Sequence, residues 1–285
     1  MYQFLSWKKV IVTSSALGSA IFLYSYLDTI QRTTISPDKF VPLDIIKVSP
    51  VNRNTNIYRL KLPRPLKEPL PVASFFHIKD DSIQILREYT PVSSSYEKNY
   101  IDFLIKRYDR GYLSRYIYSR NVGEHLEVRG PFVTFPYLAN MKKNIGMICG
   151  GTGITPMYQI INQILNNPVD KTKISLIYAN VTKQDILLYQ ELEQLAKNYP
   201  DQLKIYYTLE YPPKDELWTQ GIGYISKKMV RNHIPGPQND VLILVCGPDG
   251  MIKHVCGEKA RDLSQGPIGG LLENIDYSQE QVFKF

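Results

Sequence analysis

The pattern of apolar residues changes near residue 140, and this change constrains the fold more than any other feature. From residue 40 to residue 137, short runs rich in β-branched and aromatic residues are separated by prolines and Asn/Ser clusters, with no long amphipathic helix. Beyond this point, short apolar runs alternate with segments of helical spacing. We therefore expect an antiparallel β-barrel or sandwich over residues 40–140. A parallel sheet covered by helices on both faces is expected over residues 141–285.

Individual elements can be predicted within these two parts. In the first part we expect strands at residues 40–48, 57–62 and 101–108. In the second part we expect strands at 145–149, 174–179, 203–209 and 241–246, and helices at 155–165 and 185–198.

An uncharged run near the start of the chain predicts a membrane anchor. Residues 10–27 follow two lysines, contain no charge and just reach the ~18–20 residues that span a bilayer as a helix. A cleaved signal peptide is the alternative, but the run ends in Tyr-Ser-Tyr-Leu, which lacks a small-residue cleavage site. We expect a single-pass anchor at residues 1–30 and a linker at 31–39. The few flanking charges leave its orientation open.

Net charge and cysteine content limit the classes of binding partner and the cellular compartment. The net charge of +7 favours acidic proteins or an anionic membrane, and no zinc spacing or aromatic-basic signature points to nucleic acid. The three cysteines show no paired spacing, which indicates a reducing compartment. The four histidines lie far apart in the sequence, so we predict no metal site.

A glycine-rich segment follows the predicted strand at 145–149. It reads Gly-Gly-Thr-Gly-Ile-Thr-Pro over residues 150–156 and opens the predicted helix. Glycine lets the backbone approach a ligand, and the free N–H groups of a helix start suit a phosphate. Nucleotide binding is one interpretation, and an ordinary strand-to-helix turn is the other, because the segment is not the GxGxxG fingerprint.

Two further motifs are weak when taken singly. Residues 246–251 read Cys-Gly-Pro-Asp-Gly-Met at another strand end, where open α/β sheets hold ligands, although Cys246 could be a structural cysteine. Residues 87–93 read Arg-Glu-Tyr-Thr-Pro-Val-Ser, which offers a guanidinium for a pyrophosphate, a ring for stacking and two hydroxyls. A strand followed by a proline turn explains this segment nearly as well.

Taken in order, RxYTPxS, GGTGITPM and CGPxxM with an aromatic chain end resemble the NADH-cytochrome b5 reductase family, within the ferredoxin-NADP reductase superfamily. The resemblance covers nearly all of residues 40–285. It implies an FAD-binding antiparallel barrel followed by a Rossmann-like NAD domain. It also implies hydride transfer from NADH to FAD and single-electron transfer to an acidic haem protein such as cytochrome b5.

The resemblance assigns roles to individual residues. Thr90, near the flavin N5, and Cys246, in the nicotinamide pocket, would be the catalytic pair. Predicted flavin contacts are Arg87, Tyr89, Thr90, Ser93, Lys106, Tyr108, Gly111, Leu113, Ser114, Thr155 and Phe285. Predicted dinucleotide contacts are Gly151, Thr152, Gly153, Asp185, Gly247, Pro248 and Met251. Asp185 matches the acidic position that favours an unphosphorylated ribose, which predicts NADH over NADPH.

The chain departs from the family at two places. Residues 110–114 read Arg-Gly-Tyr-Leu-Ser where the family has GGKMS, so Tyr112 replaces a lysine that helps dock the acceptor. Residues 130–133 read Gly-Pro-Phe-Val where the family has GPxG, so Phe132 lies in an altered loop that lacks the last glycine.

These departures leave alternatives open. The acceptor could be a quinone, a ferric chelate or another haem protein. The chain could also be a membrane-tethered interaction protein that has lost efficient turnover. For an active, anchored reductase we expect the endoplasmic reticulum or the outer mitochondrial membrane, with the catalytic part facing the cytosol.

Overall fold

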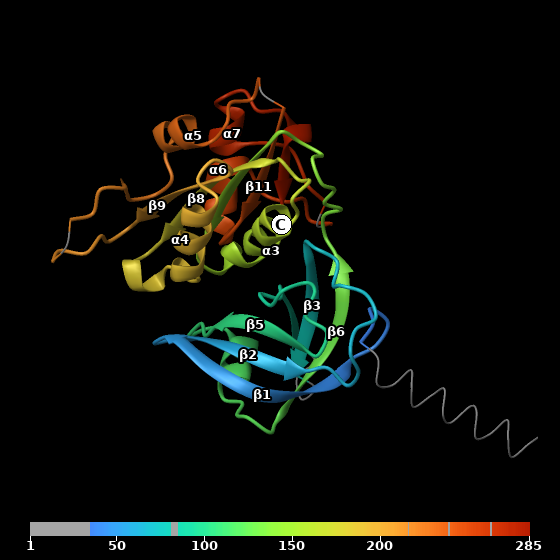
Figure 1. The fold of residues 1–285 in the computed structure, drawn as a ribbon. Helices are drawn as coiled ribbons and strands as arrows, with labels where there is room; N and C mark the ends of the chain where they lie inside the picture. Colours follow the sequence, from blue (N-terminus) through green and yellow to red (C-terminus); the bar gives the residue numbers. More distant parts are fainter. Residues whose placement is uncertain (1–34, 81–84, 216, 239, 263) are drawn as a thin grey trace, which may run out of the picture.

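The computed structural model describes residues 35–285 except 81–84, 216, 239 and 263 (Figure 1). Two six-stranded sheets form the two halves of the molecule, and their strands are consecutive in sequence within each half. The anchor predicted at residues 1–30 lies outside the described residues. Within the described ranges, no helix has the length and apolar character needed to cross a membrane.

The first sheet is antiparallel and closes into a barrel. Its strand order is β4-β3-β6-β1-β2-β5. Closure comes from the segment after β4, where Pro91 bridges to Phe103 and the Val92 N–H donates to the Asp102 carbonyl at 2.8 Å. The antiparallel prediction for this half is confirmed. The strands are β1 (Val41–Asn52), β2 (Thr55–Lys61), β3 (Ser74–Asp80), β4 (Ile85–Tyr89), β5 (Tyr100–Lys106) and β6 (His125–Val133).

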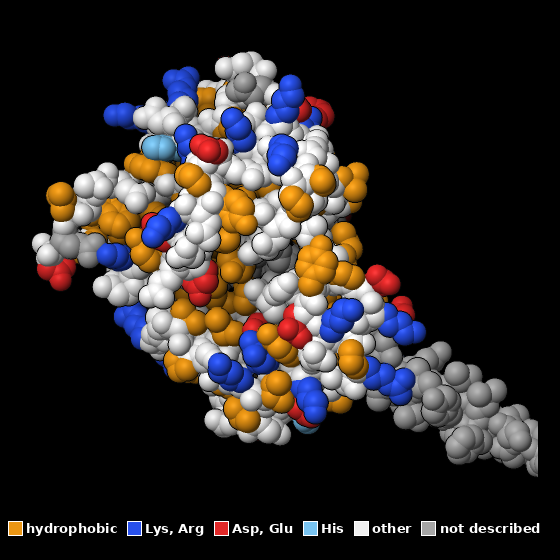
Figure 2. Space-filling view, viewed as in Figure 1, with side chains coloured by type: hydrophobic (Ala, Val, Ile, Leu, Met, Phe, Trp, Pro, Cys, Tyr) orange, Lys and Arg blue, Asp and Glu red, His pale blue; other side chains and the backbone are white. Residues whose placement is uncertain are grey.

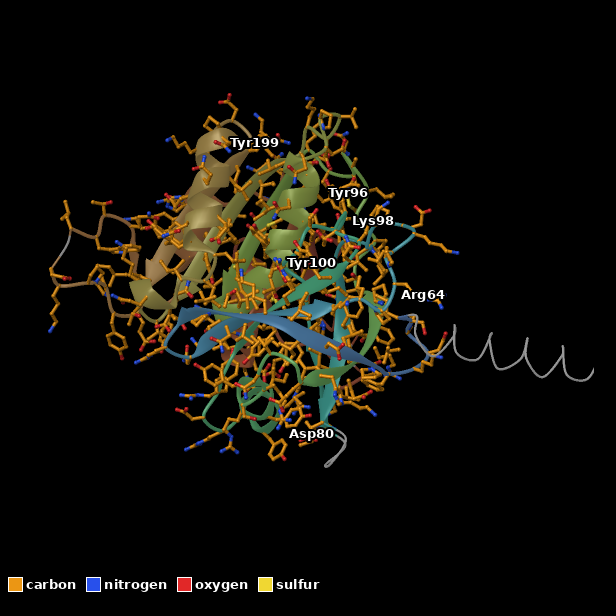
Figure 3. All side chains as sticks on the ribbon, turned by 60° about the horizontal axis from the view of Figure 1, so that its bottom comes forward. Arg64, Asp80, Tyr96, Lys98, Tyr100 and Tyr199 are labelled. Carbon is orange, nitrogen blue, oxygen red and sulfur yellow. The ribbon has the colours of Figure 1, made fainter. Side chains whose placement is uncertain are left out.

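Alternate apolar side chains of the strands form the core of the barrel. In β1 the buried positions are Val41, Leu43 and Ile45, with exposed residues between them, as expected for a strand with one buried face. The short helix α2 (Tyr112–Tyr118) contributes Leu113 and Ile117 to the same core. On the outside, the Arg59 guanidinium lies 3.7 Å from the centre of the Tyr100 ring, which Figure 3 labels on β5.

The second sheet is parallel throughout, with order β10-β9-β8-β7-β11-β12. Successive β7 residues face opposite cores: Met147 and Cys149 pack with helix α3, whereas Ile148 packs on the other side. Burial on both faces explains why these strands read as unbroken apolar runs. The strands are β7 (Asn144–Gly150), β8 (Lys173–Asn180), β9 (Leu203–Leu209), β10 (Gly221–Ile222), β11 (Val241–Cys246) and β12 (Val282–Lys284).

Helices cover both faces of this sheet (Figure 1). Helices α3 (Ile154–Leu165) and α4 (Tyr189–Asn198) pack on one face, and α5 (Lys227–His233), α6 (Asp249–Cys256) and α7 (Gly270–Glu273) on the other. Among the residues that the structure describes, single-turn 3-10 helices lie at Gly151–Gly153, Lys183–Asp185 and Gln279–Gln281. The predicted α/β half is thereby confirmed as a parallel, doubly covered sheet.

The helix predicted over residues 185–198 was wrong at its start. Helix α4 begins only at Tyr189, after a 3-10 turn that ends at Asp185 and a left-handed Leu188 with φ of 57°. Ile186, Leu187 and Leu188 are all buried. A right-handed helix cannot run through the left-handed backbone at Leu188, so α4 begins only after this residue.

The two halves meet along the α3 side of the parallel sheet. Ala73, Leu104 and Phe135 of the first half belong to the same apolar cluster as α3. The Ser74 N–H donates to the Gln159 Oε1 of α3 at 3.2 Å. With this contact in place, the barrel lies opposite the carboxyl ends of β7 and β11.

Candidate functional site

A cavity of about 660 Å³ lies between the two halves. Residues from β3, β4, β5 and α2 line it on the barrel side, and the turn after β7, the start of α3 and the end of β11 line it on the other. Most residues singled out in the sequence meet here. Those lining the cavity are Arg87, Tyr89, Thr90, Lys106, Tyr108, Gly111, Leu113, Ser114, Thr152, Gly153, Thr155, Cys246, Gly247 and Phe285.

The glycine-rich turn after β7 is shaped for close approach. Gly151 has a φ of +54°, and a Cβ built on it would meet no atom within 4 Å, so its outer side is open. At Gly153 the opposite holds, because a Cβ would lie 2.3 Å from the carbonyl oxygen of Cys246. Only glycine at 153 lets this turn pack against the end of β11.

No side chain caps the start of α3. Gly153 is the N-cap, and the Ile154 N–H donates to the carbonyl oxygens of Gly151 and Thr152 in the preceding 3-10 turn. The Tyr178 hydroxyl donates to the Gly151 carbonyl at 2.9 Å and accepts from the Leu187 N–H at 3.2 Å. The Thr155 hydroxyl donates to the Thr152 carbonyl at 3.1 Å. The Tyr178 and Thr155 hydroxyls therefore hold the turn in place.

The end of β11 supplies the second wall. Cys246 lies in register with Cys149 of β7, and both are free thiols. Burial raises the pKa of Cys246 to about 12, although the nearby Lys259 opposes this rise. The thiol is therefore neutral across the physiological range. The Met251 side chain packs against the turns that follow β7 and β11. It approaches Gly150 so closely that a Cβ built there would lie 2.8 Å from the Met251 sulfur.

Strand β4 carries the barrel side of the predicted site. Arg87 is exposed and donates to the Leu86 carbonyl at 2.7 Å. Tyr89 and Thr90 follow it and are half-buried. Burial raises the pKa of Tyr89, so its phenol stays protonated.

A turn after β5 completes the barrel side. The Ser114 hydroxyl accepts from the Tyr108 N–H at 3.1 Å and donates to the Gly111 carbonyl at 3.0 Å. These bonds hold the turn that leads into α2. Ser114 was predicted to offer its hydroxyl to the flavin, and in this structure that hydroxyl is used locally.

Two polar contacts join the halves across the cavity. Lys106 Nζ lies 3.3 Å from Asp185 Oδ1, and the Tyr108 and Thr152 hydroxyls are 3.1 Å apart. Burial alone would raise the pKa of Asp185, but the hydrogen bond from Thr182 and the Lys106 ammonium outweigh it, and the pKa is lowered. The Asp185 side chain is therefore an anion that is only 9% exposed.

Five predicted residues are not among those that line the cavity: Ser93, Gly151, Asp185, Pro248 and Met251. Ser93 accepts from the Asp102 N–H at 3.1 Å in the barrel closure. It lines a separate cavity of about 180 Å³ between α3 and the loop that carries Tyr96 (Figure 3). The roles predicted for these five residues stay predictions.

Sequence reasoning missed several residues that line the cavity. Glu88 and Arg110 adjoin motif residues, so proximity in sequence could have identified them. No local signal identifies Lys259, which the fold brings from a loop between α6 and α7. The remaining unpredicted lining residues are Ala73, Ser74, Phe75, Ile85, Leu104, Tyr112, Thr134 and Pro156.

Tyr112 and Phe132, the two residues that depart from the family pattern, lie in different surroundings. Tyr112 is 42% exposed and lines the cavity at the first residue of α2. Phe132 was placed in a loop, which was wrong: residues 125–133 form β6. Its ring stacks on Phe75 at 5.4 Å and lies beneath the Arg129 guanidinium, because these side chains share one face of the barrel.

The residues present fit a flavin and a dinucleotide. Arg87, Lys106, Arg110 and Lys259 line the cavity, so it can neutralise phosphate groups. The open side of Gly151 and the uncapped start of α3 suit the phosphates of the dinucleotide. Tyr89, Tyr112 and Phe285 provide aromatic surface for a planar ring system.

Comparison with known proteins agrees with this geometry. Residues 42–137 match the family described as "Oxidoreductase FAD-binding domain", and residues 147–257 match "Oxidoreductase NAD-binding domain". The chain is 44% identical over 266 residues to "NADH-cytochrome b5 reductase-like protein" of Arabidopsis thaliana, covering 90% of this chain and 80% of that one. It is 39% identical to "NADH-cytochrome b5 reductase 2" of Aspergillus terreus, covering 97% and 90%.

Solved structures give the same result. The cytochrome b5 reductase domain of Ulva prolifera nitrate reductase superposes with a TM-score of 0.77 at 30% identity, covering 88% of this chain and 99% of that chain. Taken together, these similarities show that the chain belongs to the NADH-cytochrome b5 reductase family and is an oxidoreductase that uses FAD and NADH.

Proposed function

We propose that this protein passes electrons from NADH through FAD to a one-electron acceptor, a haem protein of the cytochrome b5 type. The single observation that carries the proposal is the cavity shared by both halves, which gathers the flavin-side and dinucleotide-side residues. Relatives across most of the chain are named as NADH-cytochrome b5 reductases, which supports the same acceptor class.

FAD supplies the chemistry of accepting two electrons at once and releasing them singly. The chain supplies binding and alignment. Arg87 would pair with the flavin pyrophosphate, while Tyr89 and Phe285 would bound the ring system. Gly151, Gly153 and the start of α3 would hold the dinucleotide phosphates. Thr90 and Cys246, which line opposite walls of the cavity, would align the reacting rings.

Neither member of this pair acts as a base or nucleophile in the proposal. The Cys246 thiol is neutral because burial raises its pKa to about 12, and a threonine hydroxyl does not ionise at neutral pH. Their contribution is positional: they shape the contact between the two cofactors and offer hydroxyl or thiol dipoles to it.

Acceptor recognition depends on residues near the cavity mouth. Figure 2 shows Lys and Arg side chains scattered over both halves of one face, with Asp and Glu among them, rather than gathered in one patch. We propose that Arg110 and Lys259, which line the cavity, attract an acidic acceptor in place of the lysine that Tyr112 replaces. Quinones and ferric chelates are the competing acceptors.

We further propose that residues 1–30 anchor the protein as a single-pass segment. The uncharged run at 10–27 supports the anchor. The endoplasmic reticulum or the outer mitochondrial membrane, with the catalytic part facing the cytosol, is the proposed location. Three free thiols in a reducing compartment fit that orientation.

A two-stage spectroscopic experiment tests the function. Residues from 33 onward would be purified, and the visible spectrum recorded before and after anaerobic addition of NADH. We expect flavin bands that bleach with NADH and recover when oxidised cytochrome b5 is added. A reduced flavin that reduces ferricyanide or a quinone but not cytochrome b5 would refute the acceptor assignment. A colourless protein that does not take up FAD would instead favour the interaction-protein alternative.

A further inference from the structure

Lys284, next to the chain end, is a buried lysine outside the site described above. It lies in β12 and is 2% exposed. Its Nζ donates to the carbonyl oxygens of Glu258 at 3.0 Å and Pro267 at 2.8 Å. Within the described part of the chain it has no carboxylate partner. Burying an ammonium group is costly unless it is hydrogen-bonded, so these two bonds are what make its position tolerable.

Both bonds go to one segment, residues 257–262 and 264–269, which we call the strap. The strap connects α6 to α7. The Lys284 N–H donates to Gln265 Oε1 at 2.6 Å, and Gln265 Nε2 donates to the Lys284 carbonyl at 3.1 Å. Because β12 is the edge strand of its sheet, its outer backbone groups need partners, and the Gln265 amide provides them. One residue of β12 thus holds the strap by its ammonium and by its backbone.

The strap brings Lys259 into the cavity. Lys259 follows Glu258, whose carbonyl oxygen is held by Lys284, and it lines the cavity together with Cys246 and Phe285. Its side chain is half-buried and has no ion-pair partner among the described residues. Glu88 lines the same cavity 3.9 Å from His77, and its carboxylate acts on the Cys246 thiol in the opposite sense to Lys259. Lys259 thus places an ammonium near Cys246 that forms no ion pair with any described carboxylate.

We propose that Lys284 is a positioning residue: it fixes the strap so that the Lys259 ammonium lies at the Cys246 end of the cavity and favours the reduced cofactor. Hydride transfer moves two electrons and one proton from NADH to FAD, which leaves NAD⁺ and adds one negative charge to the flavin. A fixed cation beside that charge stabilises it without having to reorganise. The midpoint potential of bound FAD should therefore be higher with Lys259 in place.

The test is the midpoint potential of bound FAD in the purified holoenzyme, titrated with a redox dye. This readout does not depend on any acceptor, so it stands even if the proposed acceptor is wrong. We expect Lys259→Met to lower the potential and Lys284→Met to lower it in the same direction. The double variant should be no lower than Lys259→Met alone, because Lys284 acts through Lys259.

Lys253→Met is the matched control. Lys253 forms an exposed ion pair with the Glu258 carboxylate at 3.2 Å and does not contribute to the buried bonds. Its loss should leave the potential unchanged. This control separates the effect of removing any lysine near the strap from the loss of the buried attachment.

A second variant covers the case in which Lys284→Met does not retain FAD. Gln265→Leu removes the two bonds to the β12 backbone and leaves the ammonium in place. We expect a smaller downward shift, together with several-fold faster tryptic cleavage after the exposed Arg261 in the strap. The proposal is overturned if Lys259→Met leaves the potential unchanged. It is equally overturned if the effect of Lys284→Met persists undiminished in the Lys259→Met background.

Discussion

Lys106 and Asp185 face each other across the junction of the two halves, with Nζ 3.3 Å from Oδ1. Lys106 ends β5 of the barrel, and Asp185 ends the 3-10 turn after β8. The other carboxylate oxygen accepts from the Thr182 hydroxyl at 2.7 Å. Both oxygens of Asp185 are therefore engaged before any dinucleotide arrives.

This arrangement predicts the effect of Asp185→Asn. Loss of a charge-assisted contact of about 1.5–3 kcal/mol should lower kcat/KM for NADH by roughly tenfold or more, mainly through KM. Steady-state kinetics with NADH and NADPH would measure it. If Asp185 only joins the two halves, both coenzymes lose equally. A selective gain for NADPH would instead support the ribose contact predicted from the sequence. A wild-type preference for NADPH would contradict the coenzyme assignment.

Substitution of Gly153 should separate dinucleotide binding from flavin binding. A Cβ at 153 would lie 2.3 Å from the Cys246 carbonyl oxygen, so Gly153→Ala forces the turn away from β11. We expect a loss of stability of about 3 kcal/mol and a large rise in KM for NADH, with FAD still bound.

Gly250→Ala is the control for that variant. Gly250 lies in α6, where a Cβ meets nothing within 4 Å. Alanine there should be neutral or stabilising by ~0.5–1 kcal/mol. Equal losses of melting temperature in both variants, measured by thermal unfolding, would refute the close-approach argument.

The Cys246 thiol should not titrate in the working range. Burial raises its pKa to about 12, so the thiol is protonated at every pH below that value. Rapid-mixing measurements of flavin reduction should give pH profiles of the same shape for the wild type and Cys246→Ala. We expect the variant to be slower by about tenfold, because alignment is lost. An inflection near pH 8.5 that vanishes in the variant would show that the thiolate takes part.

Stability should fall in mild acid because of His77 and His233. Burial lowers the pKa of His77, with the Arg129 charge adding to it, and burial lowers the pKa of His233, which stacks on Tyr206 at 3.6 Å. The unfolded chain, with ordinary histidine pKa values of about 6.5, then binds more protons than the folded protein. The stability contributed by these neutral rings is complete above about pH 6.5 and declines as the pH falls below it.

Denaturant unfolding between pH 5 and 8 would measure this dependence. The double variant His77→Phe/His233→Phe should show a flatter profile, whereas His125→Gln, at the exposed start of β6, should match the wild type. A slope unchanged by the double variant would mean that other groups cause the loss.

The sequence was informative where a motif and a strand end coincide. The turns after β7 and β11 were predicted because an apolar run, a glycine and a helix start are adjacent in the chain. The start of α4 was misplaced because the left-handed backbone at Leu188 interrupts the helical path, and a leucine gives no sequence signal for that conformation. Lys259 could not be predicted, since its place depends on how Lys284 holds a distant loop.

Helix α3 has a consequence for how the two halves can vary. Its first residues adjoin the turn proposed to hold dinucleotide phosphates, and one and a half turns later Gln159 accepts from the barrel backbone at Ser74. One inserted residue between these points would rotate the second contact by about 100° around the helix axis. Exchange of the parallel-sheet half between relatives should therefore succeed only when α3 and its barrel contact travel together, whereas loops at the far edge can change length freely.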